Sequence, residues 1–402
     1  MPFAEFSKSL GRHEGPGDPD AYELLGLLRE SAPIAKVPAP TGEGFVWLVT
    51  SYELARSCLG DGRLSFDPRN ASVPQHAPGR SPYVLAKDAP EHTALRGLVA
   101  AQFSPGHIER MRPRINEICE ELLSDLTAES EVDLVEGYAL AIPETVTYEL
   151  FGIPEAERLA AGRATELALL IGLREQYSGG PATDELHTYI SHVIGSGCWA
   201  GSEGLVAALV TAQAAGEAER DDVAGMLYLL FSTAHLSSAP FIASAVLRVC
   251  LALDRDPGLR SDPYGWRSVV NESLRLDSAL QISMPRFALE DMEIGGEAIS
   301  KGDAVIVSNA AANRDPARFD APDEFRPSRA VRSHLAFGHG VHFCIGAPLA
   351  RLEGEIALNV LFHRFPTLRL ATRAEDLEWV LGPMLRSLRR LPVFLRGSAE
   401  RD

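Results

Sequence analysis

Cysteine is scarce in this sequence, and the few cysteines are spread widely. Five occur among the 402 residues, at positions 58, 119, 198, 250 and 344, and no two form a C-x-x-C pair. An odd, scattered set argues against a disulfide framework and is typical of a reducing compartment. Because the first ten residues also lack an apolar run long enough for a signal peptide or a membrane anchor, we expect a cytoplasmic protein without a membrane segment.

Positive charge is in short supply as well. The chain has 38 Lys and Arg against 55 Asp and Glu, a net charge of −17, which argues against nucleic acid and anionic membrane surfaces as partners. The length exceeds the ~250–300 residues at which a single core usually stops growing. No Gly/Ser linker or charge block divides the sequence, however, so we expect one domain over 1–402, with 1–20 as a flexible lead.

Helical periodicity dominates the chain, which predicts a mainly α fold with small β-sheet regions. The loops between these elements are rich in proline or glycine at 66–89, 179–181 and 195–204, which makes them candidates for a lid or roof over a binding pocket. The expected helices cover 22–30, 108–128, 140–151, 157–173, 221–253 and 266–276, and the expected strands lie at 44–50 and within 280–307.

The stretch from Phe337 to Arg351 sets one cysteine in a glycine-rich loop before a helix. Apolar residues recur at helical spacing from Leu349, and Pro348 suits a first turn. Cys344 therefore lies just before a helix N-terminus, where backbone N–H groups lower a thiol's pKa. Glycines at 338, 340 and 346 allow positive φ and the close approach of a flat ligand. A soft anionic ligand beside such a surface suits iron.

Two other interpretations of this cysteine stay open on residue type alone. A lone cysteine is most often a small buried hydrophobe. His339, His342 and Cys344 could instead bind zinc, although H-x-x-H-x-C matches none of the usual pairings and a fourth ligand is not evident. The glycines form neither G-x-G-x-x-G nor a Walker loop, which argues against nucleotide phosphate.

The run F-G-x-G-x-H-x-C-x-G-x-x-L-A-R, present at every fixed position, resembles the cysteine-ligand signature of the cytochrome P450 heme-thiolate enzymes. The resemblance extends from about residue 20 to the end of the chain, and it implies the P450 fold and heme b (iron protoporphyrin IX). Cys344 would be the axial iron ligand, with Gly346 beside the cofactor. Phe337 would shield the proximal side, and His342 would reach a propionate.

Two further segments gain meaning from this resemblance. His92 and Arg96 lie at i and i+4 on one face of an expected helix, where such a pair is ordinarily only solvated. The segment is similar to the family's H-x-x-x-R, which implies that both residues bind heme propionates. Arg286, in the strand-like region that passes beside the heme in the family, would bind a propionate as well.

The helix expected at 221–253 is apolar on every side and should be buried. Its middle, Ser232 to Pro240, gathers polar groups beside a proline, which marks a kink and a candidate site. It resembles the family's oxygen-binding helix, with Ala234 at the glycine position and Ser237 or Ser238 supplying the hydroxyl. Leu236 stands where the family has an acid, so the usual proton route to dioxygen is incomplete. His235 is either a proton relay or a core histidine.

Glu272 and Arg275 form an i,i+3 pair on one expected helix, and such pairs contribute little at a surface. They resemble the family's E-x-x-R, which implies a buried network for folding and heme retention, with Arg329 or Arg326 as its third member. The resemblance also implies residues that line the substrate pocket: Leu236, Leu280, Gln281, Ile282, Ser283, Met384 and Leu385.

The resemblance implies a monooxygenase that uses O2 and externally supplied electrons to oxidise a small apolar or aromatic molecule. A ferredoxin and its reductase are the expected donors, docking at a basic site to which Arg351 would contribute unless it binds local structure. The strand at 45–49 and the oxygen helix look similar to members that act on cyclodipeptide or indole scaffolds, by hydroxylation or C–C/C–N coupling in natural-product biosynthesis. The alternatives are a non-catalytic heme sensor or carrier, and a terpene or macrolide hydroxylase.

Overall fold

The computed structural model describes residues 13–14, 21–39, 44–72, 84–126, 131–170, 181–253, 258–259, 265–330, 333–381 and 384–395. The expected N-terminal lead, apart from 13–14, and the middle of the proline-rich loop at 73–83 lie outside the described residues, as does the break at 179–180. The helices are α2 (Ala21–Ser31), α3 (Tyr52–Gly60), α4 (Glu91–Ala100), α5 (Pro105–Arg110), α6 (Arg112–Ser124), α7 (Ala141–Phe151), α8 (Arg158–Leu170), α9 (Pro181–Ser196), α10 (Leu205–Ala214), α11 (Arg220–Leu253), α12 (Trp266–Leu276), α13 (Asn309–Ala312) and α14 (Ala347–Arg364).

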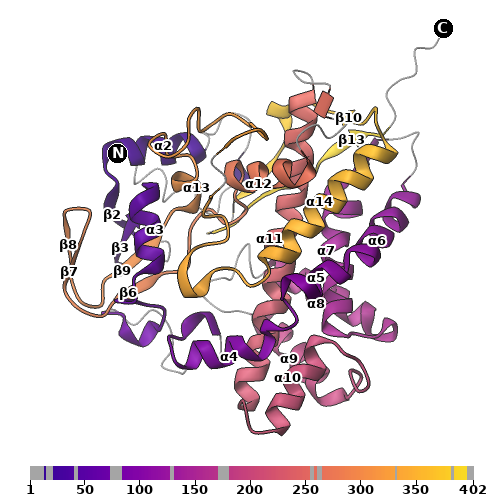
Figure 1. The fold of residues 1–402 in the computed structure, drawn as a ribbon, viewed down its shortest axis with the longest axis horizontal. Coiled ribbons are helices and arrows are strands. Elements are labelled where there is room, and N and C mark those ends of the chain that lie inside the picture. Colours follow the sequence, from indigo (N-terminus) through magenta and orange to yellow (C-terminus); the bar gives the residue numbers. More distant parts are fainter. Residues whose placement is uncertain are drawn as a thin grey trace.

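The long helix α11 runs through the middle of the fold (Figure 1). It packs against α7, α8, α9, α12 and α14, which come from distant parts of the chain. Its most apolar stretch would be long enough to cross a membrane, but 78% of that stretch is buried inside the protein, as expected for a core helix. The helix continues unbroken through Pro240. Since proline has no N–H, the carbonyl of Leu236 has no i+4 amide donor there.

The largest sheet lies to the left of α11 in Figure 1, with α3 beside it, whereas α9 and α10 lie at the lower end of α11. Its strand order is β2-β3-β9-β6-β4, with β3 and β9 parallel and the other neighbours antiparallel. Smaller sheets have the orders β1-β11-β12, β10-β13-β5 and β7-β8. The strands are β1 (His13–Glu14), β2 (Ile34–Pro38), β3 (Phe45–Val49), β4 (Leu64–Ser65), β5 (Glu131–Asp133), β6 (Arg286–Ala288), β7 (Met292–Ile294), β8 (Glu297–Ile299), β9 (Ala304–Val307), β10 (Arg369–Leu370), β11 (Trp379–Leu381), β12 (Arg386–Leu388) and β13 (Pro392–Phe394).

Most of the expected helices are present within a few residues of their predicted bounds. One exception is 108–128, which divides at Met111 into α5 and α6, with Pro113 in the first turn of α6. A proline suits that position because its missing N–H would have no helical partner there. Helices α9 and α10 were not predicted from the sequence; they flank the stretch at 195–204 that was expected to be a loop.

Candidate functional site

The cysteine loop runs directly into α14, as predicted. Cys344 donates its backbone N–H to the carbonyl of Phe337 at 2.9 Å, which closes the loop, and its Sγ accepts hydrogen bonds from the backbone N–H groups of Gly346 and Ala347. Gly340 has a φ of +77°, and a Cβ there would lie 2.6 Å from the carbonyl oxygen of Leu59, so only glycine fits. The loop therefore fixes the thiol at the start of the helix.

Two expectations about this loop need correction. The pKa of Cys344 is raised, because burial outweighs the helix-terminal N–H groups and the neighbouring Arg96 and Arg351. The side chain nevertheless retains solvent-accessible surface, so the thiol is recessed rather than sealed, and a cation at Sγ is needed to hold a thiolate. Gly346 has a negative φ of −79°. A Cβ there would lie 3.8 Å from Sγ, an ordinary van der Waals distance, so neither the backbone angle nor the local space requires glycine at this position.

The zinc alternative finds no support in the described part of the chain. No group of three His, Cys, Asp or Glu side chains there is placed to hold a metal ion. His339 packs toward Gly60 of α3, with its Cδ2 3.6 Å from the position of a Cβ on that glycine. His342 packs against His92 instead, with ring centroids 3.9 Å apart and ring planes tilted by 37°.

The four side chains expected to bind carboxylates come from three separate segments. Arg96 donates Nη2 to the carbonyl of Phe343 at 2.6 Å, which ties α4 to the cysteine loop. Arg286 is only 3% exposed, and its Nη1 has no hydrogen-bond partner among the described residues. Nδ1 of His342 likewise has no hydrogen-bond partner among the described residues. Burial lowers the pKa of Arg286 to about 10 and that of His342 to about 3. A buried guanidinium without a carboxylate partner is costly, so this corner fits an anionic ligand.

The middle of α11 has one face that is not covered. Thr233 is exposed, and Leu229, Leu230, Ala234 and Ser237 are partly so. Their spacing of i, i+1, i+4, i+5 and i+8 puts them on a single face of the helix. The two hydroxyls donate to carbonyls one turn back, Thr233 to Leu229 at 2.7 Å and Ser237 to Thr233 at 3.1 Å. Their oxygens remain available as acceptors, so this face offers two hydroxyls in an apolar stripe.

The structure does not bring His235 to that face. Its side chain is fully buried, Nδ1 donates to the carbonyl of Phe231 at 2.8 Å, and its ring lies 5.0 Å from that of Phe231 and 6.5 Å from that of Tyr148. Burial lowers its pKa to about 4, so the imidazole is neutral at physiological pH. Ser238 is buried as well and hydrogen-bonds to Glu353 of α14.

Comparison with known proteins decides the family. The cytochrome P450 family model matches residues 266–377. The cytochrome P450 monooxygenase PikC of Streptomyces venezuelae is 35% identical over 387 residues, covering 95% of this chain and 92% of PikC. The chain belongs to the cytochrome P450 family. The 6-deoxyerythronolide B hydroxylase of Saccharopolyspora erythraea is also 35% identical, over 94% of this P450 and 96% of the hydroxylase.

Solved structures agree with this assignment. The P450 enzyme CxnD, described as forming a C–S bond in chuangxinmycin biosynthesis, superposes with a TM-score of 0.87 at 29% identity and covers 94% of each chain. The tirandamycin C-bound monooxygenase TamI gives 0.84 at 33% identity, covering 94% of this P450 and 97% of TamI. The P450 fold expected from the sequence is therefore confirmed, as is its class as an oxidoreductase rather than a non-catalytic heme carrier.

The residues present fit the cofactor of this family, which is heme. Cys344 would supply a thiolate to the iron, and Nη1 of Arg286 and Nδ1 of His342 would receive propionates, with His92 and Arg96 beside them. When bound, the heme supplies the chemistry of dioxygen activation. The chain's own contribution is to hold this group, to exclude water and to orient the substrate.

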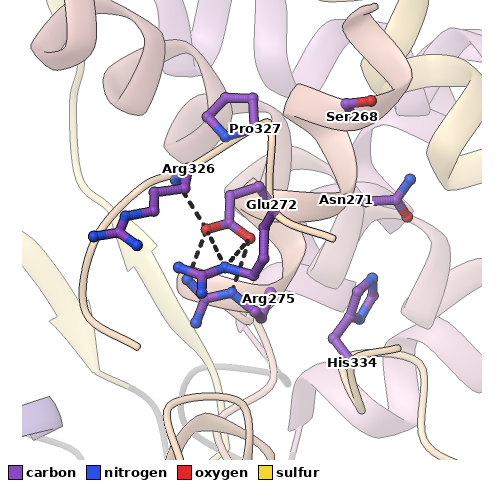
Figure 2. Close-up of a pocket in the computed structure, with 8 residues that line it drawn as sticks. Ser268, Asn271, Glu272, Arg275, Arg326, Pro327 and His334 are labelled. Carbon is purple, nitrogen blue, oxygen red and sulfur yellow. Dashed lines mark hydrogen bonds and ion pairs between the residues drawn. The ribbon is translucent and has the colours of Figure 1, made fainter. Parts of the chain in front are cut away.

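The E-x-x-R pair of this P450 is the centre of a buried network (Figure 2). Glu272 accepts from Nε and Nη2 of Arg275 at 2.9 and 2.8 Å and from Nε of Arg329 at 3.1 Å. Of the two predicted third members, it is Arg329 whose side chain joins. Arg326 contributes its backbone N–H at 2.9 Å, while its guanidinium pairs with Asp320 and Glu324.

A small pocket borders this network, lined by Ser268, Asn271, Arg326, Pro327 and His334 in addition to the paired residues (Figure 2). Its volume of about 10 Å³ has room for roughly one water. The pocket is too small for an organic substrate and lies at the structural network, so it is not the reaction site.

Most of the side chains predicted to line the substrate pocket are packed into the core. Ile282 and Met384 belong to a buried cluster between α2 and the main sheet, and Leu385 is 3% exposed. Gln281 is buried too, with its amide donating to the carbonyl of Ser278 at 2.6 Å. Of this predicted set, Leu236, Leu280 and Ser283 retain accessible surface.

Glu353 is a buried carboxyl that was not predicted from the sequence. It is 2% exposed, and its Oε2 has no hydrogen-bond partner among the described residues. Burial raises the pKa of Glu353 to about 8, although the hydrogen bond from Ser238 acts to lower it. Cys119 of α6 is a titratable neighbour. The only signal in the sequence is the position of this acid, at i+4 from Leu349 and i−3 from Ile356 on the apolar face of the helix.

Glu353→Gln is expected to flatten the dependence of stability on pH. The folded carboxyl keeps its proton up to about pH 8, whereas the unfolded chain releases it near 4.5. Stability therefore falls as the pH rises through this window, by up to about 1.4 kcal/mol per pH unit. Thermal melting between about pH 6 and 8 should show this slope in the wild type and not in the glutamine variant. Glu355 lies on the same helix as Glu353, and its carboxylate pairs with Arg112 of α6. Glu355→Gln should therefore keep the slope, and a flat pH dependence in this variant would contradict the assignment.

Proposed function

We propose that this P450 oxidises a natural-product scaffold, by hydroxylation or by oxidative C–C or C–N coupling of a cyclodipeptide-like or indole-type molecule. The observation that carries the proposal is the uncovered stripe of α11, where Leu229, Leu230 and Ala234 offer an apolar surface and Thr233 and Ser237 two hydroxyls. An apolar scaffold with a few polar groups complements such a surface. The C–S bond-forming enzyme CxnD supports the bond-forming branch of the proposal, by analogy alone.

A macrolide hydroxylase is the second candidate, favoured by the relatives. PikC and the 6-deoxyerythronolide B hydroxylase match over more than nine-tenths of the chain, and one further relative is a mycinamicin IV hydroxylase/epoxidase. Leu236 is partly exposed and stands where the family has an acid. A substrate that brings its own hydroxyl groups to the α11 stripe would supply part of the missing polar route, and macrolactones carry such groups.

A substrate panel separates the two candidates. The purified holoenzyme is titrated with indole compounds, cyclodipeptides of aromatic residues, macrolactones and fatty acids, with the spin-state shift of the Soret band as the readout. Products are then identified by mass spectrometry with and without ¹⁸O2. Tight binding of indole or cyclodipeptide compounds supports the proposal, and a product without added oxygen identifies coupling. Efficient hydroxylation of macrolactones, with no shift from any aromatic compound, would establish the second candidate instead.

We propose a ferredoxin and its reductase, in the cytoplasm, as the source of electrons. Val341 and Phe343, beside Cys344 in the same loop, are 70% and 38% exposed, which leaves an apolar spot on the surface nearest the thiol. Arg351, which was expected to contribute to docking unless it binds local structure, is engaged locally. Its Nε donates to Asn271 at 3.1 Å, and its guanidinium lies 4.6 Å from the ring centroid of Phe337.

Ser237→Ala is expected to uncouple electron use from product formation. Ser237 has its hydroxyl on the uncovered face of α11, so its loss should reduce the product formed per electron pair by roughly 100-fold, the low end of what a positioned proton-transfer group supplies. Hydrogen peroxide should account for the missing electrons. Ser244→Ala, at a buried serine of the same helix, is the matched control and should remain coupled. Equal coupling in all three proteins would remove Ser237 from the proton route.

A further inference from the structure

Four planar groups from four segments form a column beside the cysteine loop. The rings of His92 and His342 lie 3.9 Å apart between centroids, and those of His342 and Phe66 lie 3.8 Å apart. The guanidinium carbon of Arg286 lies 4.2 Å from the centroid of Phe66. Phe66 is thus placed between two groups that each have a buried nitrogen without a partner among the described residues, Nη1 of Arg286 and Nδ1 of His342. It has no place in the signature motifs and was not predicted from the sequence.

The pairing of β4 with β6 sets this contact. Leu64 pairs with Ala288 and Ser65 with Phe287, so the same antiparallel register carries Phe66 opposite Arg286. Asp88, just before α4, holds the turn, because its carboxylate accepts the N–H of Phe66 at 3.0 Å and the hydroxyl of Ser65. Phe66 is therefore fixed by backbone pairing on one side and by a carboxylate on the other.

The chemistry of Arg286 explains why an aromatic ring belongs there. The guanidinium is buried, and no carboxylate among the described residues pairs with it; the group electrostatically coupled to it is the thiol of Cys58. A carboxylate beside it would neutralise the charge and occupy the nitrogens that an anionic ligand needs. A ring face attracts the cation through its quadrupole while leaving the N–H groups at the guanidinium edge free.

We propose that Phe66 is a positioning residue for the cofactor's carboxylates, holding Arg286 and His342 in the orientation that receives a propionate. The proposal rests on the assignment of this corner to heme. It gives Phe66 two contacts with different physics. The face toward Arg286 acts through a cation–π attraction. The face toward His342 makes a tilted ring contact, which holds the cysteine loop against the segment that follows β4.

Heme release tests the proposal without any turnover. The ferric holoenzyme is mixed with excess apomyoglobin, and the transfer rate is followed at the Soret band. Phe66→Leu keeps the apolar bulk and removes the quadrupole, so release should accelerate by about 5- to 30-fold, the ratio that corresponds to a desolvated cation–π contact of ~1–2 kcal/mol. Phe66→Tyr keeps the ring and should stay within about threefold of the wild type.

Two controls make the result specific. Phe394→Leu removes a comparable contact elsewhere, with Arg369 at 4.5 Å, and should not alter release. In an Arg286→Ala background, which should itself release heme faster, Phe66→Leu should add little, because the pair acts as one unit. Equal release from the leucine, tyrosine and wild-type proteins, with Arg286→Ala still faster, would overturn the role of Phe66 alone. Unchanged release from Arg286→Ala would overturn the assignment of the corner itself.

Discussion

Cys344→Ser is expected to abolish the red-shifted Soret band of the reduced, carbon monoxide-treated protein and to lower turnover by more than the roughly 10- to 100-fold that outer-shell changes cost at metal sites. Sγ is recessed at the first turn of α14 and receives two backbone N–H groups. A serine oxygen can accept the same hydrogen bonds. The fold of the loop should therefore survive, but a neutral alcohol does not supply the electron density of a thiolate. The spectrum, taken with heme content and the thermal midpoint, checks the prediction.

Cys198→Ser is the matched control for this change. Cys198 also retains some accessible surface, but it lies in the turn between α9 and α10 and not in the cysteine loop. That variant should keep the red-shifted band and full turnover. If Cys344→Ser retained the band, or if both variants lost it equally, thiolate ligation by Cys344 would be wrong.

The features that the sequence predicts well are those encoded within one segment. The cysteine loop is one case, since its glycines, its proline and the apolar periodicity that follows act within about twenty residues. Helix α11 is another, because a helix apolar on all sides can only be a buried one. The E-x-x-R pair needed the family resemblance, since an i,i+3 pair reads the same at a surface as in a core.

The features that the sequence does not predict arise between segments. Phe66 contacts Arg286 only because β4 pairs with β6, and the residues around Phe66 in the chain do not indicate that register. The direction of the Cys344 pKa depends on how much protein surrounds the thiol, which local motifs do not report. His235 carries the residue type of a proton relay, yet its position two residues before Ser237 turns it to another side of α11.

Glu272→Gln is expected to destabilise the protein severely, by about 3–5 kcal/mol, the range for removing one partner of a buried ion pair. Glu272 is 4% exposed and Arg275 1% exposed. The carboxylate serves both Arg275 and Arg329 as well as the backbone N–H of Arg326. A glutamine removes the negative charge that faces both guanidinium groups and turns one acceptor into a donor facing donors. Soluble yield, heme content and the thermal midpoint should all fall together.

An exposed pair with the same i,i+3 spacing shows whether burial is the cause. Arg163 and Glu166 of α8 lie 3.0 Å apart with 60% and 68% of their side chains exposed. Glu166→Gln should leave yield, heme content and midpoint unchanged, because water already solvates both charges. Arg275→Lys should lower yield, heme content and midpoint nearly as much as Glu272→Gln does. A lysine cannot reproduce the forked contacts to Glu272 and to the carbonyls of Asn313 and Pro322. A tolerated lysine, or equal losses from Glu166→Gln and Glu272→Gln, would show that the network is not what holds this region of the fold.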